Sequence, residues 1–177
     1  MNRKGKEIWI TIGYQIFAEQ GQQGLKIEPL AQVVGKSKSS FYHYFADMEV
    51  FIENLLRHHM TQITVLAEKE RNAQNINPEL IAILVAHKTD LLFNRQLRIY
   101  KNVPAYGGIL QQTDSLFGDA FISVWMKDLG IKLPKSKVKA LYTLALENFF
   151  LQINPENITT DWLTTYFEEL NKVVTML

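Results

Sequence analysis

The chain has 177 residues, of which 47% are hydrophobic, and a nearly balanced charge of 19 Lys and Arg against 18 Asp and Glu. This is the composition of an ordered globular protein, long enough for one good core or for a small domain beside a larger one. Cysteine is absent, which excludes disulfides and thiol catalysis, and no apolar run approaches the roughly 18–20 residues that span a bilayer. Because the N-terminal segment also lacks the apolar stretch of a signal peptide, we expect a soluble cytoplasmic protein with no membrane partner.

A helix-turn-helix pattern lies between Ile27 and Phe51. Apolar residues recur at helical spacing in its first helix, Glu28–Val34. Gly35 predicts the end of this helix, because glycine enters the left-handed backbone region without a Cβ penalty. Ser37 is the predicted N-cap of the next helix, since its hydroxyl can accept a free backbone N–H. The spacing leaves room only for the tight turn that this motif needs.

The second helix of the pattern runs from Lys38 to about Phe45. Phe41 and Phe45 are four residues apart, so they share a face and are expected to pack on neighbouring helices. The remaining surface carries hydroxyls, an imidazole and phenols: Ser39, Ser40, Tyr42, His43 and Tyr44. Such groups can reach base edges and phosphate oxygens of DNA. On periodicity alone, a small core helix with a polar outer face is an equally good interpretation.

Residues 8–51 resemble the DNA-binding domain of the TetR/AcrR family of transcriptional regulators. In that family the first helix ends in Phe-Ala-Glu-x-Gly, a Gly-x-Ser turn follows, and the recognition helix ends in Tyr-x-x-Phe. The matching residues are Phe17, Ala18, Glu19 and Gly21, then Gly35 and Ser37, then Tyr42 and Phe45. The resemblance also implies that Gly13 is small because the recognition helix crosses close to it.

Four positions depart from the family pattern. Lys26 stands where a capping Thr or Ser is usual; a lysine can contact phosphate but cannot cap. Lys36 replaces a small apolar residue of the turn, and Ser39 replaces a Gly, Ala or Pro. Met48 occupies the position of a frequent phosphate-binding lysine, so one expected DNA contact is missing.

We predict DNA binding by nine residues of this region. They are Lys26, Lys36, Ser37, Lys38, Ser39, Ser40, Tyr42, His43 and Tyr44. Residues 1–46 carry a net charge of +3 and the rest of the chain −2. A basic N-terminal part beside a slightly acidic remainder fits binding to double-stranded DNA through its phosphates.

Beyond residue 46 the apolar periodicity is helical throughout, which predicts an all-α fold of about nine helices. We expect a three-helix helix-turn-helix domain over 1–46 and a helical effector-binding and dimerisation domain over 47–177. Asp47 is the predicted N-cap of a long helix over 48–72. The further predicted helices cover about 78–93, 95–101, 114–129 with a stop at Gly130, 135–152, and 160–177. Tyr106-Gly107-Gly108 is expected to form a flexible corner.

The last two predicted helices carry apolar residues on more than one face. A surface helix needs only one apolar stripe, so a second stripe requires a further partner. Pairing with a symmetry mate would form a four-helix homodimer interface, an arrangement that the family resemblance also implies. Two recognition helices about 34 Å apart would then match an inverted repeat in DNA. The alternative is that both helices are central in a monomer.

The resemblance further implies that a small-molecule effector binds in the helical domain and weakens DNA binding. The candidate lining residues are Phe93, Tyr100, Tyr106, Phe117, Phe121, Trp125 and Phe149. Each of these, taken singly, is better explained as plain core than as a ligand contact. Glu147 and Asn148 interrupt an apolar helix and could anchor a ligand, face solvent or bond across a dimer. The effector we expect is unidentified and largely apolar or aromatic.

We therefore predict a sequence-specific transcriptional regulator, a repressor released from a palindromic operator by its effector. The four histidines lack metal-ligand spacing, and no phosphate loop or nucleophile elbow is present, so we expect no metal, cofactor or enzymatic activity. The alternative function is a helical dimer that binds a small molecule or protein and has lost operator recognition, to which Met48 points.

Overall fold

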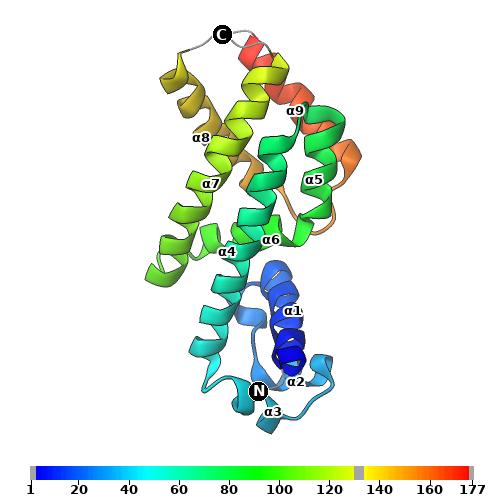
Figure 1. The fold of residues 1–177 in the computed structure, drawn as a ribbon, viewed down its shortest axis with the longest axis vertical. Coiled ribbons are helices and arrows are strands. Elements are labelled where there is room, and N and C mark those ends of the chain that lie inside the picture. Colours follow the sequence, from blue (N-terminus) through cyan, green and yellow to red (C-terminus); the bar gives the residue numbers. More distant parts are fainter. Residues whose placement is uncertain (1–2, 130–133, 176–177) are drawn as a thin grey trace.

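The computed structural model describes residues 3–129 and 134–175. Figure 1 shows α1, α2 and α3 grouped at one end, here called the head (residues 3–44), and a larger helical group, the body (residues 73–175). The long helix α4 (Met48–Asn72) begins beside the head and runs into the body. Every regular element in the described part of the chain is helical, so the predicted all-α fold is confirmed.

The helices of the head meet around an aromatic core. They are α1 (Arg3–Gln20), the short turn η1 (Gln22–Gly24), α2 (Ile27–Val34) and α3 (Lys38–Tyr44). Phe41 of α3 is fully buried, and its ring lies 5.4 Å from that of Trp9 and 5.3 Å from that of Phe51. The first turn of α4 thereby closes the core of the head.

The start of α4 follows its local sequence closely. The Asp47 carboxylate accepts the backbone N–H of Val50 at 2.8 Å, which is the predicted N-cap. The helix then continues without a break to Asn72, as predicted. One helix therefore passes from the core of the head to the core of the body.

The body contains the remaining helices, none of which is long and apolar enough to cross a membrane in the described part of the chain. They are the turn η2 (Ile76–Leu80), α5 (Ile81–Ala86), α6 (Lys88–Ile99), α7 (Pro104–Leu129), α8 (Lys135–Gln152) and α9 (Thr160–Thr175). The extents of α8 and of the start of α9 agree with the prediction. The predicted stop at Gly130 lies outside the described residues.

The predicted single helix over 78–93 is wrong. The chain bends at His87, which has φ −105° and ψ 24° and separates α5 from α6. After this bend α6 lies between the head and the rest of the body (Figure 1) and includes most of the separate helix predicted over 95–101. Apolar periodicity continues on both sides of His87, so it contains no signal of the bend.

Two expectations about glycine are also wrong. Gly107 and Gly108 form no corner, because α7 begins at Pro104 and continues through both of them. A Cβ on Gly107 would lie 2.6 Å from the Lys101 carbonyl oxygen, so a close backbone approach explains this glycine. The partner of Gly13 is Phe51 of α4 rather than the recognition helix, since a Cβ there would collide with the Phe51 ring.

Candidate functional site

The turn between α2 and α3 has the predicted backbone. Gly35 is left-handed, with φ 68° and ψ 34°, and the Ser37 hydroxyl accepts the N–H of Ser40 at 3.2 Å. Lys26 occupies the N-cap position of α2 but makes no side-chain cap, because lysine has no acceptor. These local contacts set the direction in which α3 leaves α2.

The two sides of α3 differ in burial. Phe41 and Phe45 are 0% and 1% exposed, whereas Tyr42 is 54% exposed. The aromatic side packs on α1 and α4, so the polar side faces outward. A recognition helix and an ordinary core helix with a polar outer face have the same burial pattern. What the outer face binds decides between these two interpretations.

Most of the predicted DNA-binding residues lie on this outer surface. Lys26, Lys36, Ser37, Lys38, Ser39, Tyr42 and His43 are exposed, and Ser40 and Tyr44 are half-buried. Lys26, Lys38 and Tyr42 line one surface groove between α2 and α3. Tyr44 leans on α1 instead, with its hydroxyl against the Cα of Gly5, where a Cβ would collide with it.

Charge on this surface is partly compensated. Lys38 forms an ion pair with Glu28 of α2, so it is less available to a phosphate than Lys26 or Lys36. Gln32, also on α2, lines the same groove and was not singled out from the sequence. Gln32 is a polar residue outside the apolar stripe of Leu30, Ala31 and Val34, and that position is the signal that could have identified it.

A cavity of about 50 Å³ lies inside the body. Its walls come from α4, α5, α6, α7, α8 and α9, and nearly all of them are apolar. The lining residues are Glu70, Leu84, Leu91, Phe117, Phe121, Tyr142, Ala145, Leu146, Phe149, Phe150, Tyr166, Phe167 and Leu170. Of the predicted ligand-binding aromatics, Phe117, Phe121 and Phe149 are among them.

The other predicted aromatics lie elsewhere. Phe93 stacks on Tyr14 of α1 at 4.4 Å, and Tyr106 lies 5.7 Å from Phe17, also of α1. Tyr100 lies beside Tyr106. Trp125 donates its indole N–H to Asn171 of α9 at 3.2 Å. The bend at His87 turns α6 toward the head, which is why Phe93 and Tyr100 are not in the cavity.

Glu70 is the carboxylic acid of the cavity wall, and it was not predicted from the sequence. Its side chain is 2% exposed, and Oε2 has no hydrogen-bond partner. Burial raises the pKa of this carboxyl to about 8, although the charge of Arg71 opposes the shift. Glu70 continues the apolar stripe of Ile63, Leu66 and Ala67 at helical spacing, and that position was the available signal.

Comparison with known proteins relates this fold to one family. No family model matches the sequence, and no curated protein matches it. A solved transcriptional regulator of the TetR/AcrR family from Aquifex aeolicus VF5 is 18% identical, covers 97% of this chain and 98% of its own, and has a TM-score of 0.62. The chain has the fold of the TetR/AcrR family.

Other solved structures support the same assignment of fold. A transcriptional regulator from Rhodococcus sp. Rha1 is 14% identical, covers 97% of this chain and 96% of its own, and has a TM-score of 0.65. The TetR-family transcriptional regulator PfmR from Thermus thermophilus is 14% identical, covers 93% and 97%, and has a TM-score of 0.61. The likeness therefore extends over both the head and the body.

A chain of polar contacts, buried except at Lys69, joins the head and the body of this TetR/AcrR fold. The Tyr14 hydroxyl of α1 donates to Asp90 of α6 at 2.7 Å, and Asp90 also pairs with His87 at 2.7 Å. Lys69 of α4 lies 2.9 Å from the other ring nitrogen of His87. Burial lowers the pKa of His59, which also contacts Tyr14, to about 3.

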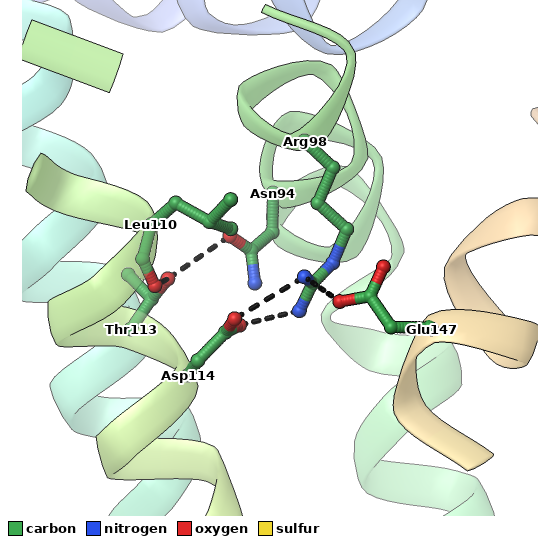
Figure 2. Close-up of polar contacts among 6 residues, drawn as sticks. All are labelled: Asn94, Arg98, Leu110, Thr113, Asp114 and Glu147. Atoms are coloured by element: carbon green, nitrogen blue, oxygen red, sulfur yellow. Dashed lines mark hydrogen bonds and ion pairs between the residues drawn. The ribbon is translucent and has the colours of Figure 1, made fainter. Parts of the chain in front are cut away.

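Glu147 takes part in a second polar cluster rather than in the cavity. Figure 2 shows the Arg98 guanidinium of α6 between Asp114 of α7 and Glu147 of α8. The Arg98 Nη1 to Glu147 Oε1 distance is 2.7 Å, and Arg98 also lies 4.3 Å from the centre of the Phe150 ring. Asn148 is exposed. Neither residue interrupting the apolar helix anchors the cavity.

The outer face of α8 and α9 remains apolar and exposed. Leu144 is 70% exposed and Val173 59% exposed. Both line a surface groove of about 480 Å³ together with Trp125, Leu141 and Trp162. Large apolar side chains gathered on one face are typical of a surface that another protein covers.

Histidine and carboxylate side chains form no metal site in the part of the chain that the structure describes. His43 is exposed on α3, His58 is half-buried, and His59 and His87 are buried in the head–body contact. Both buried histidines make a hydrogen bond through Nδ1, whereas Nε2 of His59 has no partner among the described residues.

Proposed function

We propose that this protein is a sequence-specific DNA-binding transcriptional regulator. The observation that carries the proposal is α3, whose aromatic face is buried in the head while Tyr42, His43 and Ser39 face outward. Hydroxyl, imidazole and phenol groups suit base edges and phosphates. Lys26 and Lys36, which form no ion pair with any described residue, add positive charge beside them. The TetR/AcrR fold supports the same function by analogy.

The protein acts, in this proposal, as a homodimer through the outer faces of α8 and α9. The apolar groove containing Leu144, Val173 and Trp162 supports this arrangement, because a symmetry mate would cover it with an identical surface. Two heads about 34 Å apart would read an inverted repeat in successive major grooves.

Repression would be relieved by a small, largely apolar effector in the cavity of the body. The wall of that cavity includes α4, whose first turn packs in the core of the head. A ligand that favours one tilt of α4 would change the spacing of the two recognition helices. A coupling free energy of about 1–3 kcal/mol would change operator affinity by about 5–150-fold.

A double variant, Ser40→Ala with Tyr42→Ala, tests the DNA-binding proposal. Genomic DNA fragments from the source organism are incubated with each protein at near-physiological salt, and retained DNA is quantified. The variant should retain far less DNA than the wild type while sedimenting as the same dimer. Equal retention by both proteins would show that α3 is not the reading surface.

Two observations favour the alternative of a helical binding module without operator recognition. Met48 packs against the core instead of offering a phosphate contact, and Lys38 is paired with Glu28. A dimer that retains no DNA fragment above background in the same assay would support that alternative.

A further inference from the structure

We propose that the body cavity binds the amine of a small organic cation, with Glu70 as its counter-ion. This inference rests on the proposed function, because it assigns a chemical class to the effector of the regulator. It depends on the one ionisable carboxylate of the cavity wall and on the apolar character of everything around it.

The cavity offers an apolar enclosure with a single acid. Phe117, Phe121 and Phe149 supply aromatic walls, and Leu84 and Leu91 supply aliphatic ones. The Tyr166 hydroxyl donates to the Ala145 carbonyl oxygen at 2.9 Å, so its hydrogen is already used. No Lys, Arg or His side chain lines the cavity among the described residues. An anionic ligand would therefore meet a carboxyl group and no cation.

Glu70 has no structural partner that explains its burial. It is 2% exposed, its Oε2 makes no hydrogen bond, and no ion pair to it is found in the described part of the chain. An unpaired buried polar group destabilises a fold, and a leucine at this point of the apolar stripe would avoid that cost. A carboxyl group that is buried in a cavity wall without a partner is therefore a candidate for ligand recognition.

An ammonium group supplies what Glu70 lacks. Its positive charge favours the ionised form of Glu70, which burial alone disfavours, because the surroundings screen the attraction little. Once the carboxyl has lost its proton, the N–H groups can donate to the carboxylate oxygen that lacks a partner. A neutral alcohol of the same shape offers a weaker hydrogen bond and no charge. The aromatic walls add attraction for a cation near a ring face.

The volume limits the shape of the ligand. A cavity of about 50 Å³ accepts a small amine-bearing end, and a larger effector must displace a ring such as Phe121, which is only partly buried. Glu70 also follows Lys69, which contacts His87 in the head–body chain of hydrogen bonds. Pairing of an amine with Glu70 would therefore affect the end of α4 that is connected to α1 through His87, Asp90 and Tyr14.

The test compares matched amines and alcohols on the full-length protein. Binding of propylamine and propan-1-ol, then of benzylamine and benzyl alcohol, is measured by titration calorimetry at a pH of about 8.5, where the carboxyl is mostly ionised and the amines remain mostly protonated. We expect each amine to bind the wild type more tightly than its alcohol, by about ten- to hundred-fold. Glu70→Gln should remove this preference, because the amide keeps a hydrogen-bonding group in the cavity but cannot carry the negative charge.

Controls separate the cavity from the surface and from misfolding. Glu68→Gln changes an exposed carboxylate on the same helix and should keep the full preference for amines. Glu70→Leu removes both the charge and the hydrogen-bonding group, and it should likewise abolish the preference for amines over alcohols. Equal affinity of the wild type for amine and alcohol, no binding of either amine, or an amine preference that survives both Glu70 variants would overturn the inference.

The outcome is independent of the DNA assay. Retention of genomic fragments is measured without any ligand, so a protein that retains DNA but ignores amines would lose this inference and keep the proposed function. A protein that prefers amines through Glu70 but retains no DNA would keep the binding site and lose the regulatory role.

Discussion

The Tyr14 hydroxyl donates a 2.7 Å hydrogen bond to Asp90 Oδ1 and so joins the first helix of the head to α6 of the body. Because its only hydrogen is used there, the phenolic oxygen must accept from His59 Nδ1, also at 2.7 Å. His59 is therefore the Nδ1–H tautomer. Burial, reinforced by the Asp90 charge, raises the pKa of Tyr14, so the hydroxyl stays protonated.

Tyr14→Phe tests this contact. The change leaves an oxygen of Asp90 and a nitrogen of His59 buried without their partner, so the free energy of unfolding should fall by about 1–3 kcal/mol. Urea unfolding provides the measurement. Tyr42→Phe is the matched control: this exposed tyrosine should change stability by less than about 0.5 kcal/mol. Equal effects of the two changes would contradict the assigned network.

The buried carboxyl of Glu70 predicts a pH dependence of stability. Its pKa is about 8 in the folded protein against 4.5 in the unfolded chain, so the folded state holds the proton over this interval. The contribution of this proton to the free energy of unfolding is fully present below pH 4.5 and is lost as the pH rises toward 8. The charge of Arg71 opposes the shift, and burial raises the pKa of the cavity residue Tyr166 to about 12, so Tyr166 stays neutral in this range.

The Glu70→Gln variant has no titrating carboxyl at this position but keeps the shape of the side chain. The stability of the variant relative to the wild type should therefore rise by more than about 1 kcal/mol between pH of about 5 and about 8. Urea unfolding of both proteins at the two pH values measures the difference, and groups common to both cancel. A difference that stays constant with pH would show that the carboxyl is solvated.

Two glycine substitutions should change the free energy of unfolding in opposite directions. Gly13→Ala places a Cβ against the Phe51 ring, and we expect a loss of about 1–3 kcal/mol despite the better helix propensity. Gly108→Ala has open space around its Cβ and lies inside α7, so it should gain about 0.5–1 kcal/mol. Thermal unfolding measures both. Destabilisation by Gly108→Ala would favour the flexible corner instead of a continuous helix.

Substitutions in the Arg98 cluster should lower the free energy of unfolding by unequal amounts. Arg98 is 10% exposed, and Arg98→Met leaves Asp114 without its cation, so a loss of about 1–3 kcal/mol is expected. Glu147 is 55% exposed, and Glu147→Gln should cost less than about 1 kcal/mol. Chemical unfolding of the two variants and of the double variant tests this order. A larger cost for Glu147→Gln would contradict the arrangement shown in Figure 2.

The parts of the fold that depend on local rules could be predicted from the sequence. Gly35 ends α2, Ser37 caps α3 and Asp47 caps α4 through contacts that reach only three or four residues along the chain. The polar outer side of α3 follows from the same short spacing. Which of its side chains contact DNA stays a prediction.

The parts that depend on distant contacts could not be predicted in this way. The bend at His87 is accompanied by a contact to Lys69, 18 residues earlier, within uninterrupted apolar periodicity. Glu70 is buried by helices that follow it by many residues, and a single sequence gives no pairing between them. The candidate cavity was therefore only partly identified, through Phe117, Phe121 and Phe149.

Sequencing of the genomic fragments that the wild-type protein retains at near-physiological salt tests the central claim most directly. A dimer whose two α3 helices read DNA should retain a few sharply defined regions that share an inverted repeat, with half-sites about one helical turn apart. Diffuse retention that disappears on adding salt would contradict sequence-specific reading and leave only phosphate binding.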